Sequence, residues 1–275
     1  MSVFKRNGRP HGRRRAAAAT SGAKANSRRA AAFYDVDGTL IDLNLLHSAI
    51  FVFSNIGEWS GRIGYLASFA AKLPALYLAE RRDRYLLNVA LFETFKGVSR
   101  DRLFTLGEEY CERVMIGHLY PRAAELIEAN RAANLEPVLV TGSPDFIVSP
   151  FAERLGIKTF VANRLVYSRG HATGRLHAPV MAGEAKAEWC AEYATQNGID
   201  LAECWGYADS HYDLPFLATV GHPVAVNPDR RLATTAAARQ WPIIRFEKGE
   251  QRRALPGIDR EAVSEWLERK LNGAA

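Results

Sequence analysis

Short apolar runs recur along the chain, and several of them end at an acid, a hydroxyl residue or a glycine. Runs of this length are typical of buried strands, whereas the longer segments after Ser143 and Gly183 carry apolar residues at helical spacing. Strands that alternate with helices in this way predict an α/β fold. The expected strands cover residues 30–34, 136–140, 158–162, 204–208 and 224–226.

About 100 residues separate the first two expected strands, which is far more than one crossover helix needs. We expect an inserted α-helical cap there, followed by one helix that returns to the sheet. A second excursion, residues 164–175, contains Gly170 and Gly174 and predicts a β-hairpin. Apolar spacing places the helices of the long interval at residues 43–57, 59–78, 82–95, 99–117 and 121–133.

The stretch from Ile63 to Ala79 is the most apolar part of the expected cap, with Lys72 as its charged residue and Pro74 near its middle. It is too short and too interrupted to span a bilayer, so no transmembrane segment is expected. We expect this helix to be buried within the cap. The alternative is an apolar cap surface that grips a lipid-like phosphate or touches a membrane.

The formal net charge of +6 is unevenly distributed. Residues 1–32 contain nine basic and no acidic residues, whereas the remaining 243 residues contain 27 basic and 30 acidic ones. Residues 1–30 are therefore predicted to be a disordered basic tail, which either binds polyanions non-specifically or has no role. No export or transit signal is predicted, because Arg13-Arg14-Arg15 is followed by only four alanines before polar residues. No specific nucleic-acid partner is expected.

The length of 275 residues and the hydrophobic content of 48% allow one large core and a smaller second unit. Cys111, Cys190 and Cys204 are odd in number and widely spaced, which argues against a disulfide framework or a zinc site. We expect these cysteines to be reduced and buried in a cytoplasmic protein.

The first expected strand ends in Asp35-Val36-Asp37-Gly38-Thr39, the most informative part of the sequence. Side chains two apart on a strand share a face, so Asp35 and Asp37 leave the sheet on the same side. Two like charges this close are costly unless a shared proton or a cation offsets them, and Mg²⁺ is the usual cation where phosphate also binds. The spacing excludes an EF-hand calcium loop. A solvated turn without chemistry is the alternative.

Three further segments carry groups that suit a phosphate. The second expected strand ends in Thr141-Gly142-Ser143 before a helix, and this end offers hydroxyl and backbone N–H donors to an anion. Lys186 lies near the start of the helix after Gly183, where a lone lysine would ordinarily be solvated. The strand at 204–208 ends at Asp209, and Asp213 follows four residues later. Each segment alone is a weak signal.

In order and spacing, these four motifs resemble the haloacid dehalogenase-like (HAD) hydrolases, and within them the IB-type branch that includes phosphoserine phosphatase. The resemblance covers residues 31–246, with Ala225-Val226-Asn227-Pro228-Asp229 and Gln240-Trp241-Pro242 near its end. It implies a Rossmann-like doubly wound parallel sheet with an inserted α-helical cap. The implied division is a catalytic core at 31–43 and 119–246, a cap at 44–118, and a C-terminal extension with a helix at 247–275.

The resemblance also implies roles for the motif residues of a Mg²⁺-dependent phosphatase. Asp35 would be the nucleophile that becomes an aspartyl-phosphate, and Asp37 the general acid and base. Ion-pumping relatives carry threonine at the position of Asp37 and dehalogenating relatives lack this acid, so phosphoester hydrolysis is favoured. The remaining implied roles are metal binding by Asp35, Asp209 and the backbone carbonyl of Asp37, catalytic charge neutralisation by Lys186, phosphate binding by Thr141, Gly142 and Lys186, and support of these groups by Asp213 and Ser210.

The expected substrate is a small phosphorylated metabolite, and the oligomeric state is left open. Phosphoserine phosphatases carry a glutamate nine residues after the nucleophile, where this chain has Asn44, and usually serine at the position of Gly38. Both departures weaken phosphoserine as the substrate, which stays an alternative together with a lipid-like phosphate. Glu58 or Glu80 offers a replacement carboxylate from the cap. Cap arginines favour an anionic substrate, although such residues are more often solvated: Arg62, Arg81, Arg82 and Arg84.

A protein of a different class, which binds phosphate or nucleic acid without catalysis on the same fold, is the competing hypothesis. The basic tail favours it. Asp37 argues against it, because a binding protein needs no group that relays a proton.

Overall fold

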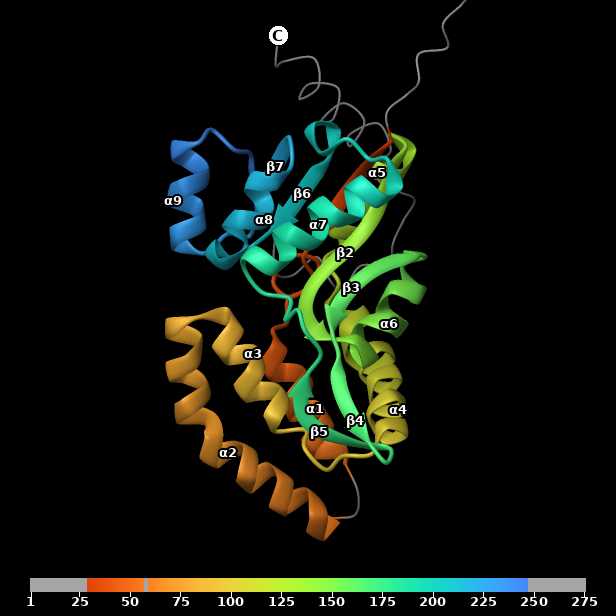
Figure 1. Cartoon of the computed structure of the whole chain (residues 1–275), viewed down its shortest axis with the longest axis vertical. Helices are drawn as coiled ribbons and strands as arrows, with labels where there is room; N and C mark the ends of the chain where they lie inside the picture. Colours follow the sequence, from red (N-terminus) through yellow and green to blue (C-terminus); the bar gives the residue numbers. More distant parts are fainter. Residues whose placement is uncertain (1–28, 57–58, 247–275) are drawn as a thin grey trace, which may run out of the picture.

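The computed structural model of the chain describes residues 29–56 and 59–246. The described residues contain a six-stranded parallel sheet in the order β3-β2-β1-β6-β7-β8 (Figure 1). The α/β prediction is thus confirmed. The predicted basic tail, up to residue 28, and the predicted C-terminal helix lie outside the described residues. The strands are β1 (Ala30–Tyr34), β2 (Leu135–Pro144), β3 (Thr159–Asn163), β6 (Trp205–Ala208), β7 (His222–Val226) and β8 (Ile243–Ile244).

Helices cover both faces of this sheet because alternate residues of each strand point to opposite sides. Ala32 and Tyr34 of β1 belong to the core on one side, where α5 (Pro121–Ala132) and α6 (Asp145–Arg154) pack. Ala31 and Phe33 belong to the core on the other side. That side is covered by α7 (Glu184–Asn197), α8 (Leu214–Thr219) and α9 (Arg230–Ala238). The arrangement is a doubly wound sheet, as predicted.

A buried polar contact joins α5 to the two central strands. The rings of Tyr34 and Tyr207 stack with their centroids 4.9 Å apart. Asn130 Nδ2 donates to the hydroxyl of Tyr34 at 2.6 Å and to that of Tyr207 at 2.9 Å. Because a buried polar group is costly without a partner, the three side chains fix how α5 sits on the sheet.

The described part of the long interval after β1 is helical, as predicted, and α1, α3 and α4 begin after good capping residues. The side chain of Asn44 accepts from the backbone N–H of Leu46 and His47, and Asp83 and Ser99 cap the next helices in the same way. The helices are α1 (Leu45–Asn55), α2 (Trp59–Arg82), α3 (Arg84–Glu93) and α4 (Arg100–Tyr110).

The last seven residues of the predicted helix 99–117 are not α-helical. The α4 helix ends at Tyr110, and a π-helical turn, Cys111–Met115, and a 3₁₀ turn, Ile116–His118, follow it. These turns bring the chain back to the sheet, where the backbone N–H of Asp42 donates to His118 and that of Tyr120 donates to Leu40, both at 3.0 Å. These backbone hydrogen bonds therefore determine the conformation after Tyr110, although the apolar spacing of the sequence predicts a continuous α-helix.

The predicted hairpin is present as β4 (Leu165–Ser168) and β5 (His171–Leu176), and it packs against the helices that follow β1. Its turn places Arg169 and Gly170 at φ of 48° and 78°. The backbone N–H groups of Gly97 and Arg100 donate to carbonyls of the hairpin, each at 2.8 Å. The three cysteines of the chain are free and buried, as expected.

The α2 helix runs along the outer edge of the molecule, away from the sheet (Figure 1). Of its described side chains, only Phe69 and Leu76 are buried. The expectation of a buried cap helix is therefore wrong, because α2 packs on the molecule along one face only. Over the described residues, every helix is too short or too polar to cross a membrane. The exposed large apolar side chains of α2 are Leu66, Leu73, Tyr77 and Leu78.

Candidate active site

The carboxyl ends of β1, β2 and β6 lie at one edge of the sheet, and the predicted motifs follow these ends. The strand order reverses direction between β1 and β6, which is where open α/β sheets bind ligands. A cavity of about 410 Å³ lies there, and α3 contributes to its wall. Its lining includes Asp35, Asp37, Arg84, Gly142, Lys186 and Asp209.

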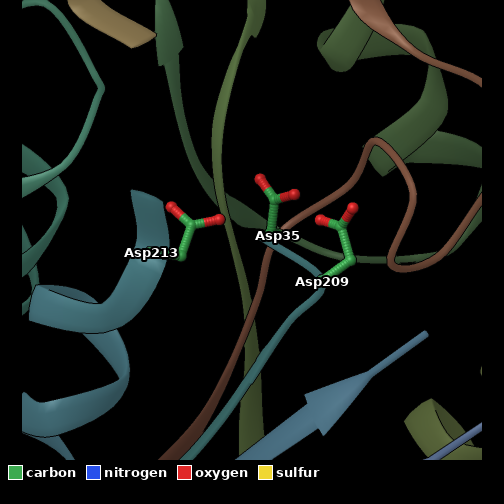
Figure 2. A group of neighbouring side chains, drawn as sticks. All are labelled: Asp35, Asp209 and Asp213. Atoms are coloured by element: carbon green, nitrogen blue, oxygen red, sulfur yellow. The ribbon is translucent and has the colours of Figure 1, made fainter. Parts of the chain in front are cut away.

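Three carboxylates gather at this edge, although they come from separate positions in the sequence (Figure 2). Asp35 follows β1, Asp209 follows β6, and Asp213 lies in a 3₁₀ turn. Each offers a carboxylate oxygen within 4.8 Å of those of the other two. Asp35 and Asp213 are buried and Asp209 is half-buried.

The electrostatics of this cluster suit a hard cation. Burial raises the pKa of both Asp209 and Asp213, and the nearby charge of Asp35 raises them further. A divalent cation with oxygen ligands would offset that repulsion. The carboxylate oxygens of Asp35 and Asp209 therefore fit Mg²⁺, and Asp213, which also pairs with Lys186, would support them. The carboxylate of Asp37, by contrast, lies outside this cluster.

Gly38 leaves room for Asp209 in the cluster. Its φ of +78° favours glycine, and a Cβ at this position would lie 2.3 Å from Asp209 Oδ2. The hydroxyl of Thr39 donates to Asp209 Oδ1 at 3.3 Å. The turn after β1 thus positions an acid from the neighbouring strand.

Lys186 is buried, contrary to what a lone lysine on a helix would suggest, and it pairs with two acids. Its Nζ lies 2.8 Å from Asp35 Oδ1 and 2.8 Å from Asp213 Oδ1. Burial alone lowers the pKa of Lys186, but these two carboxylates outweigh it and the net pKa is raised. The ammonium group therefore stays charged beside Asp35.

Asp37 differs from Asp35 in its partner. The hydroxyl of Ser143, at the end of β2, donates to Asp37 Oδ2. Burial, followed by the charge of Asp35, raises the pKa of Asp37 to about 6. The site thus holds one acid paired with a lysine and a second acid that can carry a proton near neutral pH.

The motif residues at the end of β2 differ from one another in whether they face the cavity. Gly142 lines the cavity, and its carbonyl accepts from Asn163 Nδ2 at 2.8 Å. Thr141 is fully buried, and its hydroxyl accepts from the backbone N–H of Ser143 at 3.1 Å. Ser210 lines the cavity, and its hydroxyl accepts from the backbone N–H of Tyr212.

Arg84 is the first residue of α3. Its side chain is half-buried and lines the cavity, which agrees with the interpretation of the cap arginines as contacts for an anionic substrate and not with a solvated face. Burial alone lowers its pKa, but the site carboxylates, Asp35 and Asp37 most strongly, raise the net value. Arg82 is exposed, as expected. The side chains of Arg62, Arg81, Glu58 and Glu80 lie outside the described ones.

A second group at the rim of the cavity was not predicted. His211 Nδ1 lies 2.8 Å from Asp229 Oδ2, and Arg231 lies 3.2 Å from His211 Nε2. The backbone N–H of His211 also donates to Asp229, which helps to lower the pKa of that acid against the effect of burial. His211 lies in the 3₁₀ turn after β6, whereas Asp229 and Arg231 lie at the start of α9, and the sequence alone does not bring these two places together.

The doubly wound sheet with an acid-rich cavity at its switch point defines an α/β enzyme, with helices and a hairpin inserted beside the site. More narrowly, the chain belongs to the haloacid dehalogenase-like hydrolase family, whose profile matches residues 32–218. Within the family it lies in the phosphoserine phosphatase-like branch.

Relatives by sequence support this placement. A probable phosphatase of Mycobacterium tuberculosis is 31% identical over 229 residues, which cover 83% of this chain and 79% of the relative. A phosphoserine phosphatase of the same organism is 29% identical over 225 residues, which cover 79% of this chain and 71% of the relative. The chain is thus similar to phosphatases along most of its length.

Solved structures show the same fold. A Bordetella pertussis protein described as having unknown function has a TM-score of 0.70 at 26% identity, covering 79% of this chain and 99% of that one. A phosphoserine phosphatase solved as an analogue of its phospho-aspartyl intermediate has a TM-score of 0.59 at 18% identity, covering 87% of this chain and 99% of that one. At that identity the second likeness shows the fold alone.

Proposed function

We propose that the protein is a Mg²⁺-dependent phosphatase that hydrolyses a small phosphomonoester through an aspartyl-phosphate on Asp35. The observation that carries this proposal is the pair of unlike acids in one cavity. Asp35 is paired with Lys186 at 2.8 Å, whereas burial and the neighbouring carboxylate raise the pKa of Asp37 to about 6. A nucleophile beside a cation and a separate acid that can carry a proton are what two-step hydrolysis needs.

The chemistry assigned to these acids balances in two steps. In the first, an oxygen of Asp35 bonds to phosphorus, the bond from phosphorus to the ester oxygen breaks, and Asp37 gives its proton to the leaving alkoxide. In the second, Asp37 takes a proton from water as that water attacks phosphorus, which releases Asp35 and inorganic phosphate.

Positive charge around the phosphoryl group would stabilise both steps. Lys186 supplies one charge, and Arg84 supplies a second from α3. Gly142 and Thr141 at the end of β2 are the proposed binders of the phosphoryl oxygens. A Mg²⁺ ion held by Asp35, Asp209 and the carbonyl of Asp37, with Asp213 and Ser210 supporting them, would neutralise the carboxylates and polarise a phosphoryl oxygen.

The proposed division of the chain is a core of residues 31–43 and 119–246 that performs the chemistry and a cap of residues 44–118 that selects the substrate. Arg84 and Asn44 are the cap residues that line the cavity. The hairpin β4–β5 falls within the core residues 119–246, but it packs with the cap. Its backbone carbonyls accept hydrogen bonds from the backbone N–H groups of Gly97 and Arg100 in the cap.

The substrate proposed is a small phosphorylated metabolite met in the cytoplasm. The side chain of Asn44 is a helix cap, and its amide carries no charge to pair with a substrate amine. This supports a phosphomonoester other than phosphoserine, with phosphoserine and a lipid-like phosphate as the alternatives. A phosphate-binding or nucleic-acid-binding protein without catalysis is disfavoured, because binding alone needs no second acid, such as Asp37, that relays a proton beside Asp35.

Release of free phosphate from a panel of phosphorylated metabolites tests the proposal. The panel should contain phosphoserine, histidinol phosphate, sugar phosphates and a lysophosphatidic acid. We expect Asp35→Asn to abolish turnover, whereas Asp101→Asn, at an exposed acid of α4, should leave it unchanged. EDTA should remove the activity and Mg²⁺ should restore it. Steady-state turnover by purified Asp35→Asn, or full activity after exhaustive chelation, would refute the mechanism.

A further inference from the structure

An apolar surface covers the outer side of the helices that follow β1. Nine large apolar side chains are exposed in the described residues, and seven of them lie on α2 and α3. We call these seven side chains the cap face. The four on α2 are Leu66, Leu73, Tyr77 and Leu78, and the three on α3 are Tyr85, Leu86 and Val89. Exposed apolar side chains scattered singly are ordinary, but a cluster on adjacent helices marks an interaction surface.

The sequence of α2 shows that this exposure is systematic. Leu66, Leu73 and Tyr77 are seven and four residues apart, which places them on one side of the helix. Among the described side chains of residues 64–79, the exposed positions are Gly, Ala, Leu, Pro and Tyr, with Ser68 as the polar exception. A helix face that meets only water is normally rich in charged residues. The outer face of α2 therefore has the composition of a surface that contacts an apolar partner.

Charge distinguishes between the possible partners. Residues 59–100 contain seven basic and three acidic residues, whereas the rest of the chain from residue 33 contains 20 basic and 27 acidic ones. Arg84 lines the cavity, but the other six basic residues of this segment still outnumber its three acidic ones. A net basic segment with exposed apolar side chains, on an otherwise acidic body, suits an anionic lipid bilayer. A symmetric contact between two copies of this chain would instead bring two positive surfaces together, which is unfavourable.

We propose that the cap face docks on the surface of an anionic lipid bilayer. The α2 helix has 24 residues, is interrupted by Pro74, and would lie along the headgroup region without crossing it. Its position along the outer edge of the molecule leaves this face accessible (Figure 1). The cap face includes Tyr85, which follows the cavity-lining Arg84 directly in the sequence.

Cosedimentation of the full chain with vesicles tests this docking. One set of vesicles contains phosphatidylcholine alone and a second contains phosphatidylcholine and phosphatidylglycerol. The variant carries Leu73→Ser and Tyr77→Ser, whose side chains are 42% and 57% exposed. The matched control is Ile243→Ser, which removes an apolar side chain of 40% exposure from β8. Thermal unfolding of all three proteins checks that they are folded.

We expect the wild type to bind the anionic vesicles more tightly than the neutral ones. The double variant should lose about tenfold or more of its partition coefficient, and Ile243→Ser should bind as the wild type does. The basic tail is the same in all three proteins, so equal binding by the double variant would assign any affinity to the tail and overturn the proposal. Failure of the wild type to bind, or a wild-type dimer that the double variant converts to a monomer, would overturn it as well.

Discussion

The substitution Gly38→Ala probes the geometry of the carboxylate cluster without removing any of its ligands. An added Cβ would lie 2.3 Å from Oδ2 and 2.7 Å from Cγ of Asp209. Since non-bonded heavy atoms settle at about 3.5 Å, the Asp209 carboxylate must move by about 1 Å. A displacement of that size at a reacting centre costs on the order of 100-fold in rate. The φ of +78° adds about 1–2 kcal/mol of backbone strain in the alanine variant.

Gly170→Ala separates these two effects. Gly170 has the same φ of +78°, but a Cβ there would have no heavy atom within 4 Å. We expect both variants to lose about 1–2 kcal/mol of unfolding free energy. Only Gly38→Ala should lose about 100-fold in kcat/KM and need a higher Mg²⁺ concentration for half-maximal activity. Urea unfolding and a phosphate-release assay across a Mg²⁺ titration measure the two quantities. Wild-type kinetics and metal dependence in Gly38→Ala would show that the position of Asp209 does not govern the reaction.

Three further substitutions test other parts of the structure. Asn130→Ala leaves two buried tyrosine hydroxyls without their partner and should lower the unfolding free energy by about 2–4 kcal/mol; an unchanged urea midpoint would contradict this. Arg84→Met should lower kcat/KM by roughly 10- to 100-fold, whereas Arg82→Met, at an exposed position two residues away, should not; equal effects would remove Arg84 from the site. Asn44→Ala should lower the unfolding free energy by about 1 kcal/mol, because a helix cap is lost. It should also change the preference among metabolites while leaving hydrolysis of para-nitrophenyl phosphate nearly constant. An equal loss on every phosphomonoester would show that the cap completes the chemical site.

The core of the fold and most of the site could be predicted because they depend on local signals. Short apolar runs that end in acids give strands with groups at their carboxyl ends, and parallel pairing then brings Asp35 and Asp209 together. Lys186 could be selected only through its spacing from the other motifs, since a lone lysine on a helix gives no sign of burial. In each case the sequence specifies which functional side chains lie at the end of a strand or near the end of a helix.

The features that could not be predicted depend on which way a helix faces. The apolar composition of α2 indicates a surface that avoids water, but it does not show whether the protein itself covers that surface. The helical pattern of 82–95 likewise does not show that Arg84 points into the cavity while Arg82 remains in solvent. The π-helical turn after Tyr110 results from backbone contacts of His118 and Tyr120 with residues near β1, which no local pattern encodes.

The covalent role of Asp35 is tested most directly by mass spectrometry of the Asp37→Asn variant. An amide at position 37 cannot relay protons, but para-nitrophenolate leaves without a proton, so with para-nitrophenyl phosphate as substrate the second step should slow more than the first and the phosphorylated enzyme should accumulate. After brief incubation with substrate and Mg²⁺ followed by acid quench, we expect one phosphoryl group on the peptide that contains Asp35. The Asp35→Asn variant, treated in the same way, should carry none. A phosphoryl group on another residue such as His211, or an unmodified Asp37→Asn protein that still turns over substrate, would contradict the aspartyl-phosphate mechanism.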